Sequence, residues 1–228
     1  MIFRVLSWKY IGKRIKKVSD RQSGGHWFKL WNKTVEEYFF NADSNLPVDK
    51  RELQVTIKYC CKGETRAQEK LYKMFYNYGM SIALRYAHDR FISGEIYNDS
   101  FMKIFKNLDK YDVSKNFKSW LRQIIIHTAI DTYRKELKHN NQNELAENEE
   151  KLYHTDVIDK LNADDIIRLV QSLPHLYRIV FNMYEVEGYR HEEIARTLNI
   201  AQSTSRSCLT RAKSKLRQLF MKNHEIKI

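Results

Sequence analysis

From residue 51 onward, one long stretch interrupts the helical spacing of apolar residues, the segment KHNNQNELAENEEKLYHTD at residues 138–156. The segment is polar and acidic and has almost no apolar periodicity, which is the composition of a linker. On both sides of it, apolar residues recur at spacings of three and four, the pattern of helices that bury one face. The sequence therefore predicts an all-α fold of two small helical domains joined by an acidic linker.

The composition agrees with this fold class. The chain has only 2 prolines and 7 glycines among 228 residues, so few residues would break a helix. We expect a basic N-terminal extension at 1–50, a four-helix domain at 51–138, a flexible acidic linker at 139–163 and a helix-turn-helix domain at 164–222. Two interpretations of the extension stay open: a poorly ordered basic arm, or an amphipathic segment that docks on a partner or an anionic membrane surface.

The formal net charge of +12 is unevenly distributed along the chain. Residues 51–138 include 17 basic and 10 acidic residues, and residues 166–228 include 11 basic and 5 acidic residues. Residues 139–165, between them, include 2 basic and 8 acidic residues. Two basic blocks favour a polyanionic partner. We expect the acidic linker to stay extended, to avoid nucleic acid and to hold the two blocks apart.

The motifs give no support for enzyme chemistry. The chain has no glycine-rich phosphate loop, and His191 has no nucleophile close to it in the sequence. Cys60, Cys61 and Cys208 lack the spacing of a zinc site or a disulfide framework, and we predict that they are small core residues. We therefore expect no catalytic residue, no metal, no cofactor and no small-molecule substrate.

A cytoplasmic location is expected. No apolar run approaches the roughly 20 residues that a membrane helix needs. Charges interrupt the first residues, MIFRVLSWKYIGKRIKKV, too often for a secretory signal. The cysteine usage also fits a reducing compartment.

Four apolar stripes predict the helices of the first domain. They cover residues 53–61, 67–82, 97–108 and 117–133. We expect the first helix to stop near Gly63 and the third to begin after Ser93-Gly94, because glycine weakens a helix. Each helix has one apolar face, so the four can cover one another and form a single core.

The loop KYDVSKN, residues 110–116, and the start of the next helix combine aromatic and cationic side chains. Aromatic faces can stack on extruded bases while cations contact the backbone of a single nucleic-acid strand. Tyr111 and Asn116 lie on the loop and are the better candidates for contact. Phe117 and Trp120 lie on the apolar stripe, where a core position is favoured. The cations are Lys110, Lys115, Lys118 and Arg122, and the alternative for them is a solvated surface.

The segment EVEGYRHEEIARTLNIAQSTSRSCLTRAKSKL, residues 185–216, has the pattern of a helix-turn-helix. Asn199 suits the positive φ that the turn needs, and Ile200 follows it as an apolar plug. One face of the second helix is apolar; it carries Leu209, Ala212, Leu216 and Leu219.

The opposite face carries hydroxyl and guanidinium groups, which can contact bases and phosphates in a major groove. Its residues are Ser203, Arg206, Ser207, Thr210 and Arg211. The alternative is a basic amphipathic helix that contacts no base. Two residues fit the motif less well: Ala201 lacks a capping side chain, and Ser205 faces inward where an apolar residue is more usual.

Two blocks of the chain resemble a known family. Residues 172–216, SLPHLYRIVFNMYEVEGYRHEEIARTLNIAQSTSRSCLTRAKSKL, resemble region 4 of bacterial sigma factors of the extracytoplasmic-function (ECF) group, in the sigma-70 family. The segments AQEKLYKMFYNYG, YNDSFMKIFKNLDKY and FKSWLRQIIIHTAIDTYRK resemble region 2 of the same group. The blocks follow the family's order, and the resemblance covers about residues 51–220.

The resemblance implies a sigma factor that binds core RNA polymerase and directs promoter recognition, strand opening and transcription initiation. The implied contacts with the minus-thirty-five element are Ser203, Thr204, Arg206, Ser207, Thr210, Arg211 and Lys213. The implied contacts with the minus-ten element and the melted strand are Lys110, Tyr111, Lys115, Asn116, Phe117, Lys118, Trp120 and Arg122. The implied contacts with core polymerase are Asn98, Asp99, Lys103 and Lys106.

The implied partners are core RNA polymerase, promoter DNA and an anti-sigma factor. One departure from the family pattern affects the polymerase contact: Glu95, Asn98 and Asp99 stand where an acidic residue, a glutamine and a glutamate are common. Two other functions stay open at this point. The chain could be a stand-alone helix-turn-helix regulator that binds an operator, or an interaction module whose basic N-terminal arm binds a membrane or a regulator.

Overall fold

The computed structural model describes residues 49–140 and 163–225, and every regular element in these ranges is a helix. The predicted all-α fold is thus confirmed. The predicted extension at 1–50 and the predicted linker at 139–163 lie almost entirely outside the described residues. We refer to residues 49–140 as the first helical block and to residues 163–225 as the second helical block.

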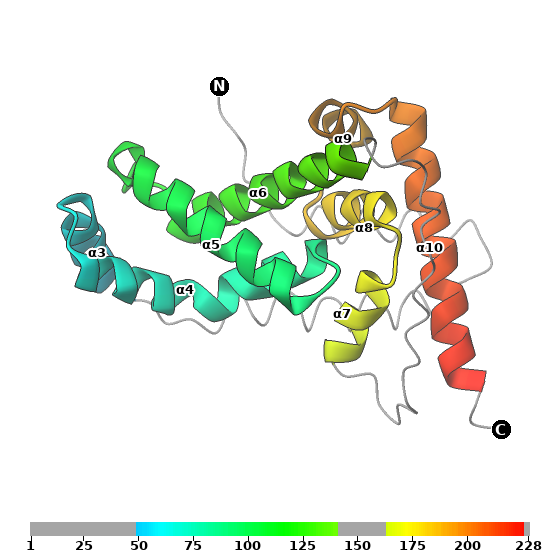
Figure 1. Cartoon of the computed structure of the whole chain (residues 1–228), viewed down its shortest axis with the longest axis horizontal. Coiled ribbons are helices and arrows are strands. Elements are labelled where there is room, and N and C mark those ends of the chain that lie inside the picture. The colour runs from blue at the N-terminus through cyan, green and yellow to red at the C-terminus, as the bar shows by residue number, and fades with distance from the viewer. Residues whose placement is uncertain (1–48, 141–162, 226–228) are drawn as a thin grey trace.

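The first block contains four α-helices and a short 3-10 turn, as Figure 1 shows. They are α3 (Lys50–Cys61), α4 (Thr65–Tyr86), α5 (Arg90–Asn107), η1 (Leu108–Lys110) and α6 (Phe117–Asn140). The described part of α6 continues past residue 133. Helix α3 ends at Cys61, close to the predicted stop near Gly63, which has a φ of 80°. Leu71, Phe101 and Leu121 are buried at the centre of this block.

The predicted start of the third helix after Ser93-Gly94 is wrong. The helix α5 begins at Arg90 and runs through both residues without a break. The carboxylate of Asp89 caps it by accepting from the Ile92 amide at 2.8 Å, and the Ser93 hydroxyl donates to the Asp89 carbonyl at 2.5 Å. An aspartate cap therefore sets the helix start, and the glycine is tolerated inside the helix.

The second block holds the helix-turn-helix. Its elements are α7 (Ala163–Gln171), α8 (His175–Phe181), a π-helical turn η2 (Asn182–Val186), α9 (His191–Leu198) and α10 (Gln202–Glu225). Asn199 has the predicted positive φ, 54°. The predicted apolar stripe of α10 packs inward, since Leu209, Ala212 and Leu216 are buried.

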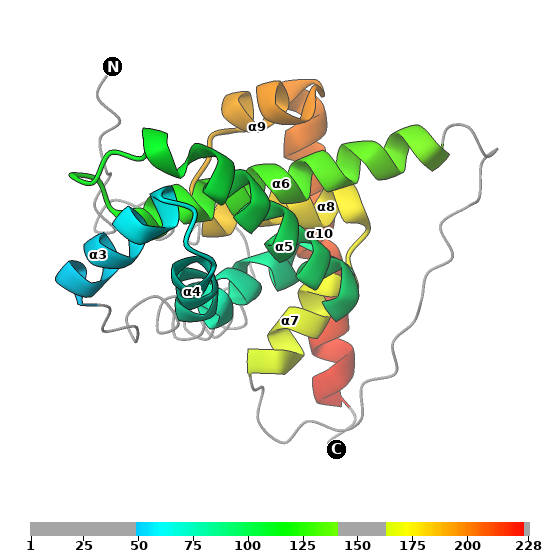
Figure 2. The same ribbon diagram turned by 60° about the vertical axis from the view of Figure 1, so that its left-hand side comes forward.

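The expectation that the linker holds the two blocks apart is wrong for this structure. Helix α4 contacts both α7 and α8, and Figures 1 and 2 show these helices beside one another from two directions. One hydrophobic core runs through both blocks. The expectation rested on the charge of the linker alone. Packing of the blocks removes the apolar faces of α7 and α8 from water, including Ile166, Val170 and Ile179, and this burial is favourable.

Candidate nucleic-acid interface

The outward face of α10 has the side chains that the sequence predicts there. Ser203, Arg206, Ser207, Thr210 and Arg211 are all exposed, and Thr204 is half-buried. The Arg211 guanidinium donates a hydrogen bond to the Tyr177 hydroxyl at 3.2 Å, so α8 orients one end of this face. The face therefore presents hydroxyl and guanidinium donors together, as base and phosphate recognition requires.

Lys213 is less available than the rest of the predicted set. Its ammonium lies 2.6 Å from the Glu185 carboxylate of η2, and both side chains are largely buried. Any contact between Lys213 and DNA must compete with this ion pair inside the second block.

A hydrogen bond explains why Ser205 faces inward. The Ser205 side chain is buried, and its hydroxyl lies 2.9 Å from Nδ1 of His191 at the start of α9. The His191 ring stacks on Tyr184 with centroids 4.4 Å apart. His191 thus joins the two helices of the motif and the preceding turn, a role that sequence spacing does not reveal because its partner lies 14 residues away.

The loop before α6 places three aromatic rings together. Tyr111 lies 5.2 Å from Phe117 and 5.0 Å from Trp120 between ring centroids, and Phe117 lies 5.6 Å from Trp120. Phe117 is buried, whereas Tyr111 and Trp120 are half-buried. Phe117 is therefore a core side chain, and the other two rings could each offer part of a face to a base.

Several polar contacts lie within the loop. The Tyr111 hydroxyl donates to the Lys115 carbonyl at 2.5 Å, and the Asp112 carboxylate accepts from the Ser114 amide and hydroxyl. These bonds from Ser114 lower the pKa of Asp112, and partial burial raises the pKa of Tyr111. These hydrogen bonds all join residues within the loop, between Tyr111 and Lys115.

The predicted cations around this loop differ in accessibility. Lys110 and Lys115 are exposed beside exposed Asn116, so they can reach a phosphate. Lys118 is half-buried, with its ammonium 5.7 Å from the centroid of the Tyr78 ring. Arg122 faces the second block, where its Nε lies 2.5 Å from the Glu187 carboxylate.

The predicted polymerase-contact residues lie on α5, and two of them have partners within the chain. Asn98 accepts from the Tyr72 hydroxyl at 2.8 Å, and the Lys103 ammonium lies 3.0 Å from the Asp131 carboxylate. Asp99 and Lys106 are exposed. Two exposed apolar residues on the same helix were not among the predicted contacts: Phe91, at 72% of full exposure, and Met102, at 57%.

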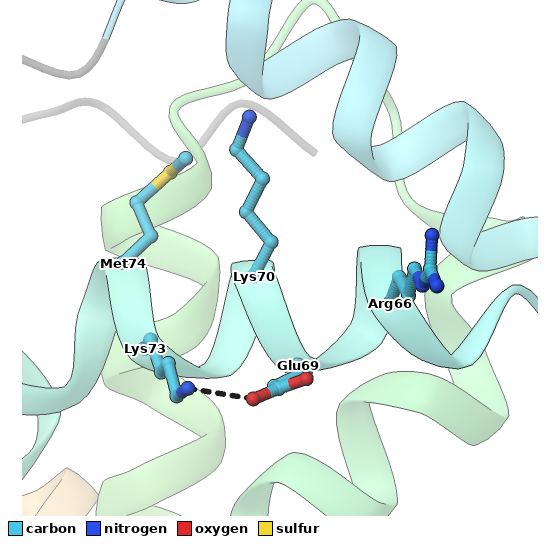
Figure 3. A pocket seen from close by; sticks show the side chains of 5 residues that line it. All are labelled: Arg66, Glu69, Lys70, Lys73 and Met74. Atoms are coloured by element: carbon cyan, nitrogen blue, oxygen red, sulfur yellow. Dashed lines mark hydrogen bonds and ion pairs between the residues drawn. The ribbon is translucent and has the colours of Figure 1, made fainter.

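A shallow hollow of about 550 Å³ lies beside the first turns of α4 (Figure 3). Its lining residues are Arg66, Glu69, Lys70, Lys73 and Met74. Glu69 pairs with Lys73 at 2.6 Å, and Glu52 pairs with Lys70 at 2.7 Å. Two of the three cations that line the hollow are thus paired with carboxylates, and Met74 is the one apolar residue in its lining.

Among the residues that the structure describes, no three His, Cys, Asp or Glu side chains are grouped so that they could hold a metal ion. None of the helices in those ranges is long and apolar enough to cross a membrane. Cys60 and Cys208 are buried as predicted, but Cys61 is exposed, so its predicted core position is wrong.

Comparisons with known proteins identify both blocks. Residues 71–138 match the family described as Sigma-70 region 2, and residues 163–216 match the family described as Sigma-70, region 4. The chain is 24% identical over 159 residues to the ECF RNA polymerase sigma factor SigM of Bacillus subtilis (strain 168). The aligned region covers 67% of this chain and 94% of SigM. It is 23% identical over 176 residues to the ECF RNA polymerase sigma-E factor of Salmonella typhimurium (strain LT2), and this alignment covers 70% of this chain and 90% of that protein.

Among solved structures, the chain is similar to the sigma factor RpoE in complex with the anti-sigma factor NepR from Bartonella quintana. The TM-score is 0.41 at 17% identity, with 75% of this chain and 96% of that chain covered. Two regions of one family, in the family's order, together with relatives of the ECF group, agree with the two cationic surfaces described above. The chain is a sigma factor and belongs to the ECF group of the sigma-70 family.

Proposed function

We propose that the chain binds core RNA polymerase and reads a promoter at two places, with the exposed face of α10 on the minus-thirty-five element and the loop at 110–116 on the minus-ten element. The observation that carries this proposal is the presence of two separate exposed surfaces with donor and cationic side chains, one in each block. The first turns of α10 would enter the major groove, so Arg206 and Arg211 are the strongest candidates for base contact.

The loop at 110–116 supplies the strand-opening part of the function. An unpaired base that stacks on Tyr111 or Trp120 would gain about 1–3 kcal/mol, which offsets part of the cost of separating the strands. Lys110 and Lys115 would hold the backbone of the same strand. We assign no chemical step to the chain itself, so it acts as an initiation factor and not as an enzyme, and it acts in the cytoplasm.

Helix α5 is the proposed contact with core polymerase. Asp99, Lys106, Phe91 and Met102 are exposed along it, which combines charged groups with an apolar anchor as in other protein interfaces. Asn98 and Lys103 would first have to leave Tyr72 and Asp131. We also propose an anti-sigma factor as a partner, on the ground of membership in the ECF group.

A binding experiment separates this function from that of a stand-alone regulator. Fluorescently labelled promoter duplex is titrated with the chain alone and with the chain plus core polymerase, at one fixed salt concentration. Specific binding is expected with polymerase present and not with the chain alone. Tight and specific binding by the chain alone would favour the regulator.

A further inference from the structure

Two cations in the middle of α10 have partners of different charge in the elements that precede the helix-turn-helix. The ammonium of Lys213 lies 2.6 Å from the Glu185 carboxylate of η2. The guanidinium of Arg211 donates through Nη1 to the Tyr177 hydroxyl of α8 at 3.2 Å. A carboxylate neutralises a cation and competes with DNA for it, whereas a phenol hydroxyl is a neutral acceptor. Arg211 is therefore held without loss of its positive charge.

The bond to Tyr177 leaves most of the Arg211 donors available. A guanidinium has five N–H donors in a planar fork, and this bond uses one of them, on Nη1. The Arg211 side chain is exposed, so the remaining donors can reach a ligand. Bidentate recognition of guanine through O6 and N7 needs two donors. Contact with Tyr177 is thus compatible with base recognition.

Tyr177 can orient another side chain because its own ring is held. It lies on α8, which packs against α10, and its half-buried ring packs against the hydrophobic core. Tyrosine has only two side-chain torsion angles, so packing of the ring leaves the hydroxyl little freedom of position. An arginine side chain has more rotatable bonds and loses much rotamer freedom when it is fixed on a base. A bond to a fixed hydroxyl removes part of that freedom before DNA binds, which favours binding.

Arg206, the other arginine on this face of α10, offers an internal comparison. It is exposed, and its guanidinium makes no hydrogen bond or ion pair with another residue in the described ranges. Arg206 would therefore lose its rotamer freedom only when DNA binds. Of the two arginines, Arg211 is the one that is oriented beforehand.

We propose that Tyr177 is a positioning residue for promoter recognition. Its hydroxyl holds the Arg211 guanidinium in the orientation in which Arg211 binds a guanine of the minus-thirty-five element, and this sharpens the preference for that base. This inference rests on the proposed function, in which α10 reads the minus-thirty-five element. Tyr177 acts through Arg211 and does not itself touch the base.

Tyr177→Phe tests this role because it removes the hydroxyl and keeps the ring with its packing. The polymerase-bound protein is titrated with promoter duplexes in which each base pair of the minus-thirty-five element is replaced in turn. Loss of one hydrogen bond should lower the preference for guanine at one position by about two- to tenfold. The position that Arg206 reads should keep its preference. Unchanged preferences, or an equal loss of binding to every duplex, would overturn the proposal.

The double variant Tyr177→Phe/Arg211→Ala shows whether the hydroxyl acts through the guanidinium. Arg211→Ala alone should remove the preference at the affected position, and the addition of Tyr177→Phe should change binding no further. Additive losses would mean that Tyr177 contacts DNA or supports the fold by itself, and would overturn the positioning role.

Tyr189→Phe is the matched control. Tyr189 lies before α9 in the same block, its ring is likewise half-buried against the core, and it has no side-chain hydrogen bond to the described part of α10. The control should keep every base preference, and a loss equal to that of Tyr177→Phe would overturn the proposal. Thermal unfolding followed by circular dichroism should show that each variant is folded.

The same titrations separate failure of this inference from failure of the proposed function. A lost guanine preference in Arg211→Ala, with none lost in Tyr177→Phe, would overturn the positioning role and leave α10 as the reader. Unchanged preferences in both Arg211→Ala and Arg206→Ala would refute base reading by α10, and the role of Tyr177 with it.

Discussion

At the scale of single residues, exposure separates the side chains that can contact DNA from those that cannot do so in this arrangement. Arg206, Thr210 and Arg211 are open to solvent, whereas Lys213 and Arg122 are held by Glu185 and Glu187. By residue type alone, all five are plausible DNA contacts. Glu185 lies 28 positions from Lys213, and Glu187 lies 65 positions from Arg122, so the sequence alone does not show which of the five side chains are held by a carboxylate.

Replacement of Arg206 or Arg211 by alanine should affect recognition of one base pair. A bidentate contact between arginine and guanine contributes about 1–3 kcal/mol of discrimination, so each variant should lose preference at one position of the minus-thirty-five element. Selection from a randomised promoter library with the polymerase-bound protein measures this. Arg217→Ala, exposed further along α10, is the control and should keep all preferences. Equal effects of all three variants would mean that α10 does not read sequence.

Ser205→Ala should destabilise the second block. The substitution removes the hydrogen bond between Ser205 and Nδ1 of His191, and the loss of such a bond costs about 0.5–1.5 kcal/mol. Urea unfolding followed by circular dichroism gives the change in the free energy of unfolding. Ser203→Ala, at an exposed position on the same helix, should stay within about 0.5 kcal/mol of wild type. Equal stability of the two variants would show that the bond to His191 contributes nothing.

At the scale of elements, the sequence predicts most of the helices but not which helices pack against one another. The main helices are predictable from the spacing of apolar residues, including the stripe of α10. The end of α3 is predictable from Gly63 and the turn before α10 from Asn199, because each of these signals acts within a few residues. The start of α5 was misplaced because the Asp89 cap and Ser93 outweigh the glycine. The contact of α4 with α7 and α8 depends on residues more than 80 positions apart, and no local pattern encodes it.

Two glycines of the first block should respond to alanine in opposite ways. A Cβ at Gly79 would lie 2.2 Å from Cε2 of Tyr97, so Gly79→Ala should force α4 and α5 apart and cost about 1–3 kcal/mol. A Cβ at Gly94 would meet nothing within 4 Å, so Gly94→Ala should stabilise α5 by about 0.5–1 kcal/mol. Thermal unfolding of both variants tests this. A stabilised Gly79→Ala would contradict the close crossing of the two helices.

At the scale of the whole molecule, the contact between the blocks makes stability depend on pH. His175 Nδ1 of α8 lies 3.0 Å from the Glu136 carboxylate of α6. Burial lowers the pKa of His175 below 6.5, with Arg178 and His88 adding to the effect and Glu136 opposing it. The hydrogen bond from His175 lowers the pKa of Glu136 below 4.5.

Both groups resist protonation in the folded chain, so the free energy of unfolding should fall as the pH drops. The loss should begin as the pH approaches 6.5, the unfolded value for His175, and continue below 4.5 as Glu136 protonates. Urea unfolding at a series of pH values measures it. His175→Gln should remove the upper part of the loss and also reduce the lower part, because the hydrogen bond from His175 is the largest cause of the lowered pKa of Glu136. An unchanged profile in that variant would show that His175 does not cause the upper part.

We propose that this sigma factor directs polymerase to promoters by means of two surfaces on separate helical blocks. The decisive experiment is run-off transcription with purified core polymerase on a promoter library. We expect initiation at defined starts that depends on added chain. Arg206→Ala should reduce it at some promoters, and Lys115→Ala should reduce it at all of them. Absence of any defined start with the chain present would contradict it.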